Sequence, residues 1–135
     1  MSAKISWMVY EDEVFLPYNT YMADGVYTTN ETITRRIQIW NNYQGISAVD
    51  DIINAKLVLS FKQYEDNFLL NLLTVKSVDD NKVLEPQMDI DRVVYNIGTL
   101  YGNAGGNCKE IELSIGPLPA NIRSELKSLI FYLDY

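Results

Sequence analysis

The chain has 135 residues, 47% of them hydrophobic, and a formal net charge of −7. That length suits one domain that buries a core without disulfides or metals, and the hydrophobic content excludes a disordered chain. The acidic surface repels phosphate backbones, and the longest basic run is only Arg35-Arg36, so we expect no nucleic-acid partner. We predict a single β-sandwich domain over residues 1–135.

The absence of histidine removes most catalytic and metal-binding chemistry. A Ser-His or Cys-His pair and a histidine general base are excluded, as are histidine-based zinc and iron sites. The one cysteine, Cys108, can form neither an intrachain disulfide nor a thiolate cage, and we expect it to be structural or inert. The sequence therefore predicts a protein that is not an enzyme, with no catalytic residue, cofactor or metal.

No secretory signal and no membrane span is expected. Residues 1–4 lead directly into the mixed segment 5–10, and every apolar run is far shorter than the ~20 residues that a membrane helix needs. We expect synthesis in the cytoplasm without a signal peptide and no membrane partner.

Short apolar segments separated by Asn, Asp and Gly clusters follow one another along the whole chain, which is typical of an all-β sandwich or barrel. The strands we predict span residues 5–10, 14–16, 26–28, 32–40, 56–61, 68–78, 83–84, 88–97, 109–115 and 129–135. Segment 14–16 is expected at a sheet edge, because Pro17 lacks a backbone N–H. Residues 98–107 form a glycine-rich loop. The spacing of its glycines fits neither the Walker pattern nor the dinucleotide-binding pattern.

Alternation within the strongest segments identifies the expected core. Ile33, Ile37 and Ile39 share one strand face, with Arg35 in register among them. Segment 68–78 is apolar on both faces and predicts a central strand. The core side chains that we predict from these patterns are Leu57, Leu59, Phe61, Leu70 and Leu72.

Two connections remain open between helix and irregular structure. Ser47 and Asp50 have the spacing of a capping box, so residues 47–54 form either a two-turn helix or an irregular crossover. Residues 120–127 cross over, with room for one helical turn through Ile122 and Leu126. Alternation also fails at Val93-Val94, which is typical of a β-bulge.

Two sets of side chains are candidates for binding. Asp89 and Asp91, two apart on a predicted strand, would share a face and could bind calcium or act as an acid pair, although solvated turn residues explain them as well. The chain also has ten tyrosines, a residue enriched at protein interfaces. We expect Trp7 and Trp40 in the core or at its rim, and Tyr43, Tyr64 and Tyr101 at an interface.

The stretch from Gly116-Pro-Leu-Pro-Ala-Asn through Ser128 to Tyr135 resembles the end of many immunoglobulin-like sandwiches, where a corner leads into a last alternating strand. The whole chain, which is short, rich in Asn and Tyr and free of His, resembles small structural proteins of bacteriophage virions. These resemblances imply an antiparallel β-sandwich, immunoglobulin-like or jelly-roll, with one or two short helical turns. They also imply a capsid-decorating, neck, tail or baseplate module that contacts copies of itself or other virion proteins.

The alternative is a carbohydrate-binding sandwich, which would use exposed Trp or Tyr rings near Asn and Asp side chains. A coplanar pair of exposed rings would favour that alternative.

Overall fold

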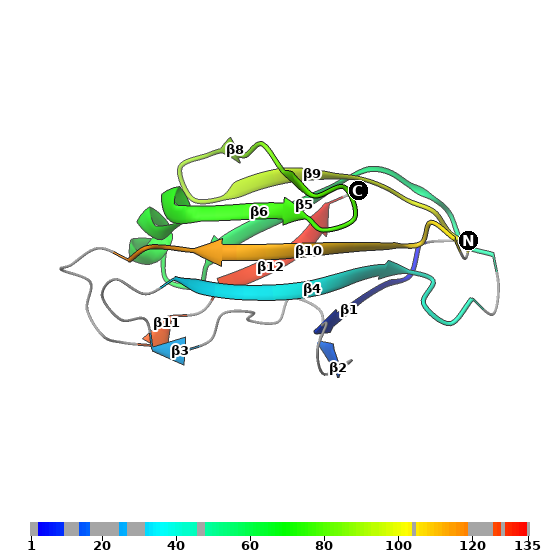
Figure 1. Ribbon diagram of the computed structural model, residues 1–135, viewed down its shortest axis with the longest axis horizontal. Helices are drawn as coiled ribbons and strands as arrows, with labels where there is room; N and C mark the ends of the chain where they lie inside the picture. Colours follow the sequence, from blue (N-terminus) through cyan, green and yellow to red (C-terminus); the bar gives the residue numbers. More distant parts are fainter. Residues whose placement is uncertain are drawn as a thin grey trace.

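In the computed structural model, two antiparallel sheets lie face to face, as an all-β sandwich requires (Figure 1). The structure describes residues 3–9, 14–16, 25–26, 32–45, 48–103, 105–118, 126–127 and 129–134. The predicted fold class is therefore confirmed.

The larger sheet has six strands in the order β2 (Val14–Leu16), β1 (Ile5–Val9), β4 (Ile33–Asn41), β10 (Cys108–Ile115), β6 (Leu73–Ser77) and β7 (Lys82–Val83). The other sheet has four strands in the order β12 (Leu129–Asp134), β5 (Ile52–Phe61), β9 (Val93–Leu100) and β8 (Gln87–Met88). A separate pair joins β11 (Leu126–Lys127) to β3 (Gly25–Val26). Strand β2 lies at an edge, as Pro17 predicted.

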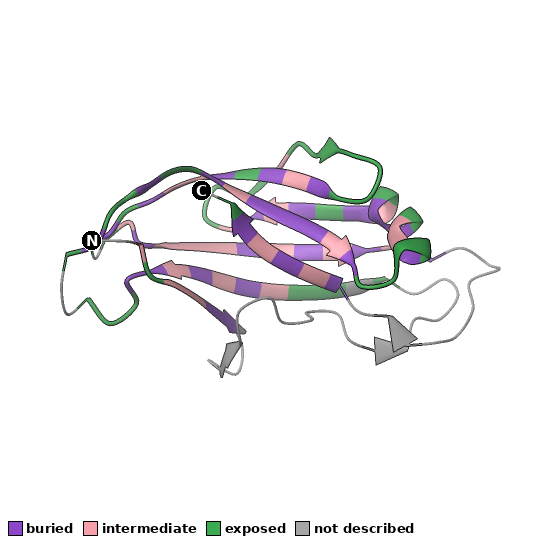
Figure 2. Ribbon diagram, turned by 180° about the vertical axis from the view of Figure 1, so that it is seen from behind, coloured by how far each residue is buried: buried purple, intermediate pink, exposed green. Residues whose placement is uncertain are grey.

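The core lies between the two sheets and is built by alternation along the strands. Buried and less buried residues follow one another along β9, β10 and β12 (Figure 2). The Trp7 ring of the larger sheet meets the Phe131 ring of the smaller one edge to face, with ring centroids 4.7 Å apart. Trp7 is thus a core residue, and this contact joins the sheets near one edge of the sandwich.

Most of the predicted core is confirmed. Leu57, Leu59, Phe61 and Leu70 are buried, whereas Leu72 is only half-buried and packs against the rim of the core. In strand β4, Ile37 and Ile39 are buried and Arg35, though in register with them, is exposed.

The predicted central strand over residues 68–78 is wrong. Residues Tyr64–Leu72 form a 3-10 helix, η1, and the strand is limited to β6 (Leu73–Ser77). A 3-10 helix has three residues per turn, so Asp66 and Leu69 fall on one face and are both buried. The apolar residues that suggested burial on two strand faces are instead divided between a buried helix face and an exposed one, which carries Phe68.

Of the two alternatives for residues 47–54, the irregular crossover is found at residues 48–51 and the helix is not, and strand β5 already begins at Ile52. Register shifts interrupt its pairing with β9 between Ile52 and Lys56, and Asn54 has a φ of 51°. Because the pairing is irregular here, the two buried positions Ile52 and Ala55 are three residues apart instead of two, a spacing that is also typical of a helix. Residues 46 and 47 lie outside the described residues.

The single strand predicted over residues 88–97 is a hairpin. Strands β8 and β9 pair antiparallel, and the turn between them closes where Asp89 N donates to Arg92 O at 2.8 Å. The alternation is lost at Val93-Val94 because β9 begins there, so the predicted bulge is wrong. Strand β9 continues to Leu100 and thus includes the first residues of the loop predicted over residues 98–107. A turn over residues 78–81 joins β6 to β7, which pair antiparallel.

The predicted strands at both ends of the chain are confirmed as β1 and β12, except for Tyr10 and Tyr135, which lie outside the described residues. Ile122 also lies outside them. Leu126, expected in a helical turn, belongs to strand β11 and pairs with Val26.

Candidate functional site

Exposed apolar side chains gather at opposite ends of the sandwich. Tyr43 and Tyr101 lie at the end formed by the loops after β4 and β9, which we call the loop end. Helix η1 and the β8–β9 turn form the other end, which we call the helix end (Figure 1). The exposed apolar side chains of the helix end are Tyr64, Phe68, Met88 and Ile90.

A buried asparagine fixes the loop end. Asn41, the last residue of β4, is 0% exposed. Its Oδ1 accepts a hydrogen bond from Lys4 N at 3.0 Å, and its Nδ2 donates to Asp50 O at 2.9 Å and to Leu100 O at 3.3 Å. One side chain thus satisfies backbone groups of three segments that are distant in sequence.

Two further asparagines extend this arrangement. The Asn42 side chain donates to Gly102 O at 2.7 Å, and the Asn107 side chain donates to Asn42 O at 3.3 Å. Asn42 has a φ of 59°, a left-handed conformation that asparagine tolerates better than most residues. We call Asn41, Asn42 and Asn107 the asparagine clamp; it holds the loops after β4 and β9 together.

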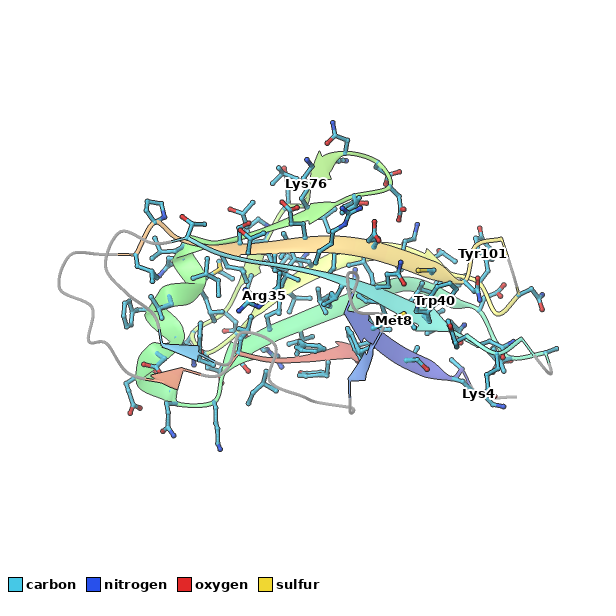
Figure 3. All side chains as sticks on the ribbon, turned by 60° about the horizontal axis from the view of Figure 1, so that its bottom comes forward. Lys4, Met8, Arg35, Trp40, Lys76 and Tyr101 are labelled. Atoms are coloured by element: carbon cyan, nitrogen blue, oxygen red, sulfur yellow. The ribbon has the colours of Figure 1, made fainter. Side chains whose placement is uncertain are left out.

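The exposed rings of the loop end stand on this clamp. Trp40 and Tyr43 meet with their centroids 4.9 Å apart and their planes at 83°. Trp40 Nε1 donates to Gln38 Oε1 at 3.2 Å, which orients the indole. Figure 3 shows Trp40 and Tyr101 at the same end of the sandwich. The Tyr101 ring lies so close to Gly106 that a Cβ there would be 2.5 Å from its Cδ2. The two tyrosines are therefore presented by fixed backbone.

The hydrogen bonds continue from Gln38 to a carboxylate. Glu110 accepts from Gln38 Nε2 at 3.2 Å and from the Arg36 guanidinium, with which it forms an ion pair, and only 12% of its side chain is exposed. These contacts link β10 to β4 on this face of the larger sheet.

The cysteine is not activated. Burial, together with the negative charges of Asp79 and Glu110, raises the pKa of the Cys108 thiol to about 12. The thiolate is the nucleophilic form, so this thiol is protonated and unreactive near neutral pH.

The acidic pair that suggested calcium is arranged differently from its prediction. Asp89 and Asp91 are both exposed in the turn between β8 and β9, not two apart on one strand. Asp89 accepts from Ile90 N at 2.8 Å and lies 3.8 Å from Arg92 Nε. Among the described residues, no three His, Cys, Asp or Glu side chains come together as a metal site would require.

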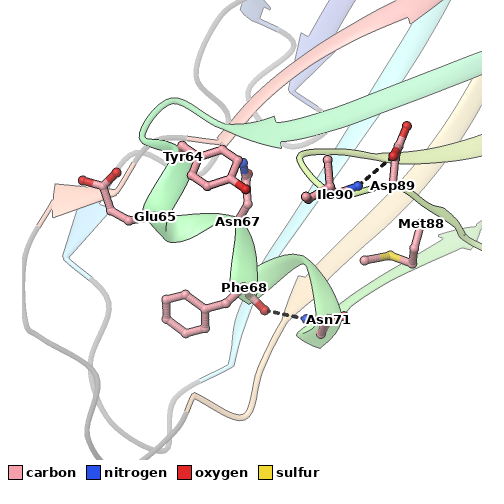
Figure 4. A pocket seen from close by; sticks show the side chains of 8 residues that line it. All are labelled: Tyr64, Glu65, Asn67, Phe68, Asn71, Met88, Asp89 and Ile90. Carbon is pink, nitrogen blue, oxygen red and sulfur yellow. Dashed lines mark hydrogen bonds between the residues drawn. The ribbon is translucent and has the colours of Figure 1, made fainter.

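The helix end holds an open groove of about 430 Å³ between η1 and the β8–β9 turn (Figure 4). Tyr64 and Phe68 line it from the helix, and Met88 and Ile90 stand opposite on the turn. Fixed backbone supports the helix side, where Asn67 Oδ1 accepts from Phe61 N at 2.8 Å and Asn71 Nδ2 donates to Phe68 O at 3.1 Å. The groove is polar at its margin, where Glu65 and Asp89 lie.

The predicted interface tyrosines are thus divided between two surfaces. Tyr43 and Tyr101 are 43% and 51% exposed and lie together at the loop end, while Tyr64 is 63% exposed at the helix end. Sequence reasoning missed the clamp, whose only signal was the Asn41-Asn42 pair at a strand end. It also missed Phe68, Met88 and Ile90, because the first was assigned to a central strand and the other two to a single strand over residues 88–97.

No protein-family model matches this chain, and no curated protein matches its sequence. Within the described part of the chain, no helix is both long enough and apolar enough to cross a membrane.

Proposed function

We propose that this protein is a non-enzymatic assembly module that acts through protein–protein contacts, and that it serves in a bacteriophage virion. The virion setting rests on the resemblance of the sequence to small virion structural proteins. The contact function is supported by one observation above all: exposed apolar rings are mounted on fixed backbone at the loop end.

Fixed rings make good contact residues for a physical reason. A side chain held before binding loses little conformational entropy when a partner covers it. Tyrosine combines a large apolar surface with a hydroxyl that can still find a partner. Tyr43, beside Trp40, and Tyr101, against Gly106, both meet this description.

Ring geometry argues against the carbohydrate alternative at this surface. Sugar stacking needs a flat platform, and the Trp40 and Tyr43 planes are nearly perpendicular at 83°. The assembly proposal therefore fits the loop end better than a sugar-binding one.

The test measures association of the whole chain with and without its loop-end rings. Complexes isolated from the native source after cross-linking are expected to contain this chain bound to copies of itself or to another protein. The double variant Tyr43→Ala, Tyr101→Ala should weaken the reconstituted association about tenfold or more, since aromatic residues dominate the energy of most interfaces. Its matched control is Val83→Ala, which removes an exposed apolar side chain from strand β7, away from the loop end.

A glycan array and a chelator control accompany this measurement. Tight binding to a sugar, or association that disappears with chelator, would overturn the assembly proposal. A chain that stays monomeric in the native source and in reconstitution would overturn it as well.

A further inference from the structure

We propose that the groove at the helix end is a docking site for a segment of another protein that presents one bulky apolar side chain flanked by lysine or arginine. This inference deepens the proposed function and rests on it, because it names the chemistry of a partner. It concerns a surface opposite to the loop end, so the two can be tested separately.

The apolar part of the argument is the exposure of the groove's walls. Phe68 is 50% exposed, Met88 47% and Ile90 78%, and Tyr64 beside them is 63% exposed. Single exposed apolar residues are ordinary, but four around one concavity indicate a surface that a partner covers. An open groove of about 430 Å³ has room for one large side chain and is too shallow to enclose a ligand.

The charge around the groove selects the partner. Two exposed carboxylates, on Glu65 and Asp89, line the groove, and a third, on Asp91, lies in the same turn. Arg92 lies 3.8 Å from Asp89 and offsets one of these three charges, so the margin keeps a net negative charge. A cationic segment is therefore attracted and an acidic one repelled.

The same charges exclude a symmetric pairing of two copies through this groove. A two-fold contact would bring Glu65 and Asp89 against their own counterparts, on a chain whose net charge is already −7. Like charges brought together at an interface are unfavourable.

Strand addition to β8 is also disfavoured. This edge strand has two residues, and Pro86, directly before it, has no N–H to offer a further strand. The partner is therefore held by its side chains, an apolar one in the groove and cationic ones on the rim.

The test uses the full chain and three synthetic peptides, followed by the amide NMR spectrum of the protein. The first peptide places one tryptophan between two pairs of lysines, the second replaces tryptophan with serine, and the third replaces the lysines with glutamates. We expect the first to shift amides of η1 and of residues 87–92 in a saturable manner. We expect the serine peptide to bind about tenfold or more weakly and the glutamate peptide to cause no shifts.

Two variants tie the binding to the groove. Ile90→Ser should weaken the tryptophan peptide about tenfold, whereas Ile53→Ser, which changes an isoleucine that is 65% exposed at the loop end, should leave it unchanged. Both side chains are exposed, so the fold is expected to tolerate both changes.

Equal binding of the tryptophan and serine peptides would overturn the inference, because the contact would then be charge alone. Shifts centred on the loop end, or equal effects of Ile90→Ser and Ile53→Ser, would overturn it too. If the peptide fails while native complexes still depend on Tyr43 and Tyr101, the groove inference is refuted and the proposed function stands.

Discussion

Removing the Asn41 side chain tests whether the asparagine clamp determines the stability of the loop end. Asn41→Ala deletes one acceptor and one donor group from a site that is 0% exposed. Lys4 N, Asp50 O and Leu100 O then lose their partners at 3.0, 2.9 and 3.3 Å.

The expected cost follows from these three contacts. A typical hydrogen bond contributes ~1 kcal/mol net, and a buried group left unsatisfied costs ~1–3 kcal/mol. The Leu100 bond is buried, whereas those to Lys4 and Asp50 are partly buried and water can replace some of their loss. We therefore expect the free energy of unfolding to fall by about 3 kcal/mol, out of the ~5–15 kcal/mol of a typical domain.

Urea unfolding followed by circular dichroism measures this change. With a urea dependence of ~1–3 kcal/mol per molar, the midpoint should move down by about 1–3 M. Asn103→Ala is the matched control, because Asn103 is exposed in the same loop region. Its free energy of unfolding is expected to stay within ~0.5 kcal/mol of the wild type.

A loss below ~0.5 kcal/mol for Asn41→Ala, or one equal to that of Asn103→Ala, would refute the account of the clamp. The loop end would then be held by its backbone contacts alone, and the rings would not be fixed in the way that the proposed function requires.

Three further outcomes are expected. Leu59→Ala should cost ~2–5 kcal/mol in urea unfolding because it opens a cavity in the core, while Ser60→Ala on the opposite strand face should cost far less; equal effects would place the core on the wrong face of β5. Gly102→Ala should destabilise the loop end by ~1–3 kcal/mol, because its Cβ would lie 2.1 Å from Val49 O, and an unchanged melting temperature would contradict this contact. Burial raises the pKa of Cys108 from 9.0 to about 12, so the unfolded chain releases this proton first and stability should fall as pH rises from 9 toward 12. Burial also raises the pKa of Tyr95, from 10.0 to about 12, so Cys108→Ser should reduce that slope, most clearly between pH 9 and 10, and change stability little below pH 9; an unchanged slope would show that the thiol is not protected.

The sequence alone determined the fold class and the main strands. Strict alternation in segments such as 109–115 leaves only one register that buries Ile111, Leu113 and Ile115, so local pattern and tertiary structure agree. Composition alone also excludes some chemistry: a chain without histidine and with one cysteine has no histidine-based catalytic pair and no thiolate cage, whatever its fold.

Only the tertiary structure decided the irregular elements. The run from Phe68 to Leu73 is apolar enough for a buried strand, and it became a 3-10 helix followed by a strand because one helix face, with Leu69, covers the core. In β5 the irregular pairing with β9 makes Ile52 and Ala55 successive buried positions, so burial follows the spacing of a helix although the segment is a strand. The spacing of apolar residues cannot distinguish helix from strand in these two segments, because a bulge or a 3-10 turn changes that spacing.

The candidate surfaces depended on tertiary structure most of all. Tyr43, Tyr64 and Tyr101 are equivalent in the sequence, and folding placed two of them at one end and the third at the other. Phe68 and Ile90 line the same groove, although nothing in the sequence indicates that their segments lie side by side. Exposure and proximity are properties of the packed sheets, so residue type names the candidates and only the fold decides which of them share a surface.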